Sequence, residues 1–197
     1  MPQMPEYTTT LSPTPPALTA VFSDETLTRA AELAADAYRP LWVGPSGEES
    51  SGELVARHLE ATSALLDKDG WVRAYDYSKD WSTGANLAAD DSQTVEQMVR
   101  SLVRFVREDS GPGPQRSLST ALGHIGVAGA HGDPDTAYIA SEVMNFVVQA
   151  HTGSDSARVT PWSERKHRTH ADITALLMAS ARFARLHGPA GQEPEAS

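Results

Sequence analysis

The sequence predicts a mostly α-helical protein, a bundle of about six helices with one short aromatic hairpin or extended segment. Apolar residues recur at helical spacing in several stretches, most clearly where Val95, Met98 and Val99 are followed by Leu102 and Val106. Residues typical of helix starts and stops bracket these stretches. Alternation typical of a strand is confined to residues 71–83, "WVRAYDYSKDWST". Together these patterns favour a helical bundle.

Each expected helix has its own boundary signal. The first begins with an acidic turn and ends before Pro40, the second ends at Gly70, and "GPGP" follows the third. The fourth repeats glycine at every third position, which predicts that another helix approaches its backbone closely. The helices are expected at residues 24–38, 52–69, 92–108, 117–131, 134–151 and 170–187.

Two helix entrances can be specified by residue. Asp133 followed by Pro134 is typical of an N-cap and first helical position. Thr169 and Asp172 have the spacing of a capping box, in which each side chain bonds the other's backbone amide. A loop of about 17 residues precedes this second entrance, longer than connections usually are. Within it, Trp162 is the expected apolar anchor, and Glu164 lies close enough in sequence to pair with Arg168.

The composition indicates one domain in a cytoplasmic protein. Residues 1–22 are rich in proline and threonine and are expected to be disordered, residues 23–188 form a single helical domain, and 189–197 form a disordered tail. The chain has no cysteine, no recognisable signal peptide and no apolar run long enough to span a membrane. Its formal net charge of −10 opposes general attraction to nucleic acid or to anionic membranes.

Three stretches resemble a known family. They are "DGWVRAYDY", "STALGHIGVA" and "WSERKHRTHADITALLMASARFA", the last with a tryptophan–acid pair, then Arg-Thr, then an acid and an amphipathic helix. Over about residues 52–187 the chain resembles an uncharacterised helical domain family common in actinobacterial genomes and their mobile elements. The resemblance implies a shared helical fold and an intracellular bacterial origin. It implies no activity.

One helix carries a candidate ligand site. Polar residues of the stretch 134–151 follow helical spacing on an otherwise apolar helix, so they share one face. If that face lines a pocket, the chain is expected to be a small-molecule-binding enzyme. If the face is turned to water, the polar residues are only the solvent-exposed stripe of the helix. Two histidines elsewhere, His58 and His124, can extend the pocket. For His58 a hydrogen-bonded residue of the core is the commoner role. The candidates are Tyr138, Glu142, Asn145 and Gln149, with His58 and His124.

No motif names a reaction. The seven histidines lack a recognised metal-ligand spacing, and the sequence has neither a G-x-S-x-G motif nor a phosphate-binding loop. We therefore expect no metal and no cofactor.

The leading hypothesis is a non-catalytic binding or regulatory module with a protein partner. Residues 157–187 hold six Arg or Lys against two acidic residues, and aromatic residues gather in 71–81. A nucleic-acid partner is not expected, because the basic stretches follow no recognisable helix-turn-helix order. The oligomeric state stays open, as does whether the basic stretches share one surface. The candidate surface residues are Trp71, Tyr75, Trp81, Arg100, Arg104, Arg107, Arg165 and Arg168.

Overall fold

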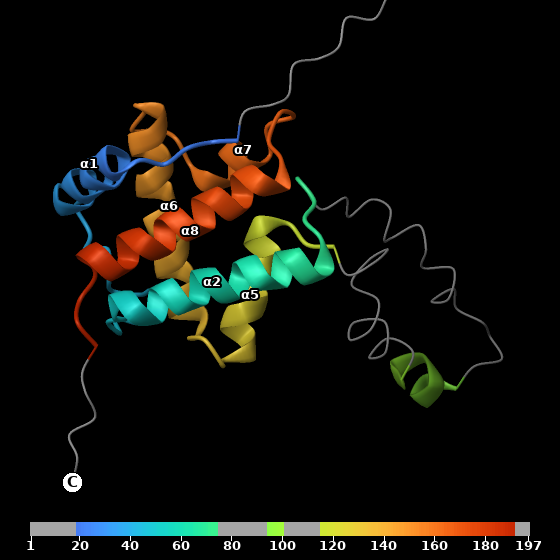
Figure 1. Ribbon diagram of the computed structural model, residues 1–197. Helices are drawn as coiled ribbons and strands as arrows, with labels where there is room; N and C mark the ends of the chain where they lie inside the picture. The colour runs from blue at the N-terminus through green and yellow to red at the C-terminus, as the bar shows by residue number, and fades with distance from the viewer. Residues whose placement is uncertain (1–18, 75–93, 101–114, 192–197) are drawn as a thin grey trace, which may run out of the picture.

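The computed structural model describes residues 19–74, 94–100 and 115–191. Within these ranges the regular elements are α-helices, and β-pairing is limited to isolated bridges. The expected mostly helical bundle is therefore confirmed. Residues 95–100 are also helical and lie apart from the bundle (Figure 1). The helices of the bundle are α1 (Asp24–Ala35), α2 (Gly52–Asp69), α5 (Leu118–Ala128), α6 (Pro134–Thr152), α7 (Val159–Ser163) and α8 (His170–His187).

Helices α2 and α8 lie side by side and antiparallel, with α6 crossing behind them (Figure 1). At one end of this pair the Gly52 amide donates to the carbonyl of Pro189 at 2.9 Å, and at the other end the His170 ring lies 3.3 Å from the Asp67 carboxylate. A Cβ atom at Gly52 would overlap the carbonyl of Ala184. Glycine at this position therefore allows the backbones of α2 and α8 to approach closely.

The core surrounds α6, which contacts all the other helices of the bundle. This helix buries apolar side chains over most of its circumference, as the sequence indicates. Trp162 and Phe183 are the largest fully buried side chains, so the expected role of Trp162 as an apolar anchor is confirmed. The apolar residues that α6 buries are Ile139, Ala140, Val143, Met144, Val147 and Val148.

Both predicted helix entrances are present. The Asp133 carboxylate accepts from the Thr136 amide at 2.8 Å, and this hydrogen bond lowers the pKa of Asp133. At α8 the Thr169 hydroxyl accepts from the Asp172 amide at 3.3 Å, while Asp172 accepts from the Thr169 amide at 2.8 Å. Short-range sequence rules located these two sites because the bonds join residues only three positions apart.

The long loop expected before α8 needs correction, since it contains the five-residue helix α7. A helix of five residues is too short for apolar periodicity to reveal it in the sequence. The predicted pairing of Glu164 with Arg168 is not among the ion pairs of the described residues. Instead, the Arg168 guanidinium lies 3.8 Å from the centre of the Trp162 ring, where it stacks on the indole.

Two helices are shorter than expected. Helix α1 ends at Ala35 rather than at residue 38, and α5 spans Leu118–Ala128 rather than 117–131. Gly129 ends α5 with a φ of 72°, a conformation that favours glycine. Of the three repeated glycines only Gly126 meets another helix closely, because a Cβ there would lie 3.1 Å from that of Ala137. The expected close approach is thus limited to one position.

The aromatic segment is described only at its beginning. Trp71 forms an isolated parallel bridge with Arg116, and the Val72 amide donates to the Arg116 carbonyl at 3.0 Å. Arg116 also contacts Asp69 at 2.8 Å. These bonds join the points at which residues 75–114 leave and rejoin the bundle. The rest of the predicted extended segment, 75–83, lies outside the described residues.

No helix of the described residues is long and apolar enough to cross a membrane.

Candidate interaction surface

The polar stripe of α6 holds a neighbouring segment. Asn145 and Gln149 are buried, whereas Tyr138 is exposed and Glu142 is half-buried. The Asn145 side-chain oxygen accepts from the Val159 amide at 2.8 Å, and its nitrogen donates to Glu142 at 3.1 Å. Gln149 donates to the carbonyl of Ala157 at 3.3 Å. The two buried amides therefore fix the chain that leads into α7, so the stripe is neither a simple solvent face nor a row of free ligand groups.

A cavity close to this stripe is too small for a substrate. It lies between α5, α6 and α7 and holds about 20 Å³, room for about one water molecule. None of the four candidate residues of the stripe lines it. The lining residues include Ser117, Ser119, Ser141, Thr160 and Ser163.

The two candidate histidines differ in environment. His58 is fully buried, and its ring nitrogens lie 2.9 Å from the carbonyl oxygen of His131 and 3.1 Å from that of Leu122. It is thus the hydrogen-bonded core residue that its place in an apolar stripe favours. Burial lowers the pKa of His58, although the two carbonyl groups partly offset that effect. His124 is exposed on α5.

No group of three or more potential metal ligands occurs among the residues described.

The candidate aromatic and basic residues are brought together only in part. Arg73, two positions after Trp71, donates to the carbonyl of Arg168 at 3.3 Å. The start of the aromatic segment and the basic stretch before α8 therefore meet, with Arg165 exposed nearby in sequence. Arg100 belongs to the separate helix at 95–100 (Figure 1). Tyr75, Trp81, Arg104 and Arg107 lie outside the described residues.

Residues 19–22 pack along the bundle, although they fall within residues 1–22, which were predicted to be disordered. The Ala20 amide donates to Asp172 at 2.6 Å, using the carboxylate of the α8 capping box. Phe22 lies against two aromatic rings, 4.6 Å from His151 and 6.0 Å from Trp162 between centroids. Burial raises the pKa of Asp172, but hydrogen bonds from Ala20 and Thr169 outweigh it, so the net pKa is lowered. The ionised carboxylate thus anchors the segment.

A groove of about 550 Å³ runs between this segment and the outer face of α8. We call it the α8 groove. Val21 is 76% exposed and Met178 is 47% exposed, so its apolar walls are open to solvent. The groove is lined by Ala20, Val21, Phe22, Ala175, Met178, Ala179, Arg182 and Arg185.

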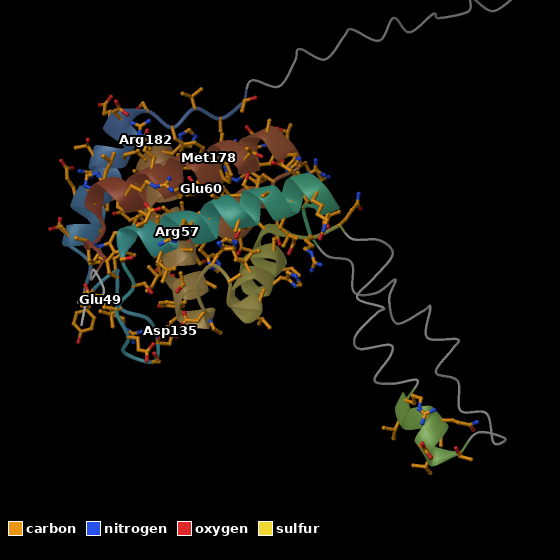
Figure 2. All side chains as sticks on the ribbon, turned by 60° about the horizontal axis from the view of Figure 1, so that its bottom comes forward. Glu49, Arg57, Glu60, Asp135, Met178 and Arg182 are labelled. Atoms are coloured by element: carbon orange, nitrogen blue, oxygen red, sulfur yellow. The ribbon has the colours of Figure 1, made fainter. Side chains whose placement is uncertain are left out.

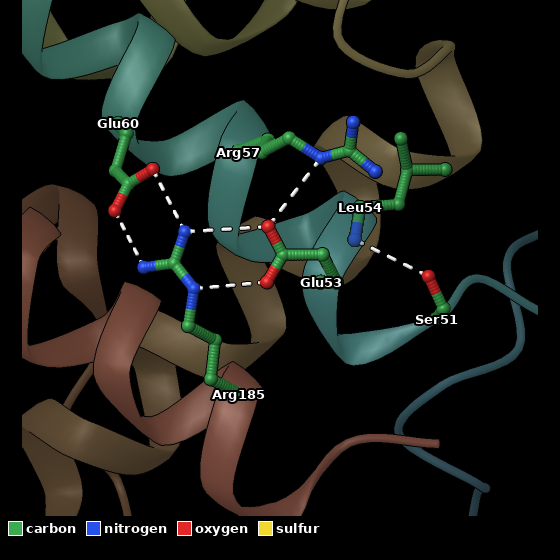
Figure 3. A network of polar contacts seen from close by, with 6 residues as sticks. All are labelled: Ser51, Glu53, Leu54, Arg57, Glu60 and Arg185. Atoms are coloured by element: carbon green, nitrogen blue, oxygen red, sulfur yellow. Dashed lines mark hydrogen bonds and ion pairs between the residues drawn. The ribbon is translucent and has the colours of Figure 1, made fainter. Parts of the chain in front are cut away.

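Both arginines that line the groove form ion pairs with acidic residues of other helices. Arg182 forms an ion pair with Asp24 of α1. Figure 2 shows Arg182 and Met178 on the same side of the bundle. Arg185 reaches across to α2, where it donates to Glu53 at 2.9 Å and to Glu60 at 2.5 Å (Figure 3). Hydrogen bonding by Arg185 lowers the pKa of Glu60.

The α8 groove was not predicted from the sequence. The apolar pattern of the last helix indicates an inward stripe, which in the structure includes the buried Ile173 and Leu176. A second row, Ala175, Met178, Ala179 and Arg182, has the spacing i, i+3, i+4, i+7 and covers the outer face. The sequence could have indicated this row, because its small and flexible apolar residues leave a shallow surface on the helix. The sequence could not have indicated the opposite wall of the groove, since residues 20–22 follow a proline-rich stretch without periodicity.

A family described as "Family of unknown function (DUF6197)" matches residues 50–183. No curated protein and no solved structure matches the chain. The match includes α2 and most of α8, whereas residues 19–22 and α1 lie outside it. One wall of the α8 groove therefore belongs to the matched region, and the other wall precedes it.

Proposed function

We propose that this chain, which belongs to the DUF6197 family of unknown function, is a non-catalytic cytoplasmic binding module that docks a protein through the α8 groove. The observation that carries the proposal is an apolar groove of about 550 Å³ in which Val21 and Met178 remain exposed. Exposed apolar surface of this kind is typical of protein-binding sites. Methionine in such a site adapts to side chains of different shape.

The chemistry of the groove favours a protein over a small polar substrate. Its walls are alkyl and aromatic, and its two guanidinium groups already bind Asp24, Glu53 and Glu60. A small-molecule site needs a few polar groups that converge on the ligand. A partner's apolar side chain needs only shape and contact area, which the groove offers.

The enzyme alternative has less support. It depended on Tyr138, Glu142, Asn145 and Gln149 presenting polar groups to a ligand. Two of these side chains bind the backbone of residues 157–159 instead. A structural role accounts for their position in α6 without a substrate.

The proposal can be tested by site-specific photocrosslinking in the host cell. A photoreactive amino acid replaces Met178 in the groove or, as a matched control, Val127, which is an exposed apolar residue of α5. We expect position 178 to give discrete protein adducts of higher mass that position 127 does not give. Identical adducts at both positions, or none at position 178, would argue against docking in the groove.

A further inference from the structure

The described residues carry a second exposed apolar surface, on the helix at residues 95–100. Val95 is 72% exposed, Met98 is 38% exposed and Val99 is 53% exposed. The three side chains share one face, because their spacing is i, i+3, i+4. Every residue from 94 to 100 is exposed, and Figure 1 shows this helix apart from the bundle. The helix is therefore amphipathic with its apolar face open.

We infer that the apolar face of this helix occupies the α8 groove of its own chain and competes there with the partner. The inference rests on the proposed function, since the groove is the same site. The helix and the groove are complementary in kind: one is a narrow apolar ridge, and the other is an apolar trough with exposed Val21 and Met178. Helix-in-groove binding uses anchors at this spacing.

The attachment of residues 75–114 brings the two surfaces within reach. This part of the chain leaves and rejoins the bundle at paired points, where Val72 bonds Arg116 and Arg73 bonds the carbonyl of Arg168. Arg168 stands next to Thr169, the N-cap of α8. From there Met178 lies about 15 Å along the helix, at 1.5 Å per residue.

The connecting lengths permit this docking within one chain. Residues 74 and 94 are separated by about 20 peptide units, and residues 100 and 115 by about 15, so either connection can span at least about 45 Å when extended. Both lengths exceed the distance from the start of α8 to the groove. Because the helix is tethered, its effective concentration at the groove reaches the millimolar range expected of short linkers.

An engineered disulfide tests the contact directly. The natural chain has no cysteine, so a disulfide in the variant Val99→Cys/Met178→Cys can form only between the introduced residues. Under mild oxidation of the dilute full-length protein, we expect an intramolecular disulfide. The matched control is Val99→Cys/Val127→Cys, which should oxidise at least about tenfold more slowly because its second position is outside the groove. Equal rates in the two variants, or disulfide-linked dimers alone, would overturn the inference.

A second variant keeps the test independent of cysteine geometry. Adding Val95→Glu to the Val99→Cys/Met178→Cys protein places a charge on the apolar face and should abolish the disulfide. Adding Gln97→Glu, on the opposite face of the same helix, should leave it in place. If both changes have the same effect, the helix does not dock through its apolar face.

A labelled peptide of residues 92–108 measures the competition. We expect it to bind the Val95→Glu/Val99→Glu chain about tenfold more tightly than the natural chain, whose own helix occupies the groove. Met178→Glu should remove that binding. Equal affinity for the two chains would overturn the inference. A partner that is photocrosslinked at position 178 would still support the proposed function in that case, so failures of the two proposals can be distinguished.

Discussion

The side-chain oxygen of Asn145 accepts a hydrogen bond from the backbone amide of Val159 at 2.8 Å, and both groups are buried. This bond joins α6 to the first residue of α7. Through this bond, a polar side chain of α6 supports the segment that carries Trp162.

Replacing Asn145 with alanine should therefore lower the free energy of unfolding by about 1–3 kcal/mol, because the Val159 amide would be buried without a partner. Chemical denaturation measures the change. Glu142→Gln is the matched control, since an amide oxygen at position 142 can still accept from Asn145. A loss as large in the control as in Asn145→Ala would contradict the role assigned to the Asn145–Val159 bond.

The entrance of α8 gives a second prediction. Thr169→Ala should lower the free energy of unfolding by about 1 kcal/mol through the lost cap. Trp162→Ala should lower it by about 3 kcal/mol or more, since the ring is fully buried. Thermal melts of both variants provide the test, and unchanged midpoints would contradict the packing described here.

The buried His58 predicts sensitivity to acid. Burial lowers its pKa in the folded protein, so the unfolded chain takes up the proton first as pH falls below about 6.5. The stability contributed by neutral His58 is complete above that pH and is lost as pH falls towards the lower folded pKa. Urea unfolding at several pH values should show a stability decrease that His58→Gln reduces.

A decrease in stability of the same size in His58→Gln as in the natural protein would show that the effect does not come from the buried ring.

The anchor between Ala20 and Asp172 predicts a local change. Asp172→Asn removes the charge from the acceptor of the 2.6 Å bond and should release one wall of the α8 groove. Hydrogen exchange at residues 20–22 should accelerate, while exchange in the middle of α6 should change little. Protection of residues 20–22 equal to that of the natural chain would show that Phe22 alone holds the segment.

The sequence predicts local features of this fold more accurately than long-range ones. The caps at Asp133 and Thr169 could be located because each joins residues three positions apart. The helix predicted at residues 170–187 has the observed bounds of α8. In contrast, the bond from Ala20 to Asp172 joins residues 152 positions apart, and no local rule connects them.

The candidate site was less predictable than the fold for the same reason. The polar spacing of Asn145 and Gln149 correctly indicated one shared face, but it could not show that α7 covers that face. The α8 groove depends on residues 20–22 lying along a helix more than 150 positions later. Its walls become neighbours only through tertiary packing.

The central claim is that the α8 groove binds a protein partner, and a titration tests it most directly. A partner identified by photocrosslinking is titrated against the natural chain, Met178→Glu and Val127→Glu, with the melting temperature of each recorded. We predict that Met178→Glu weakens binding by at least tenfold, a loss of about 1.4 kcal/mol, at an unchanged melting temperature, while Val127→Glu binds as the natural chain does. Equal affinity for all three proteins would contradict the account.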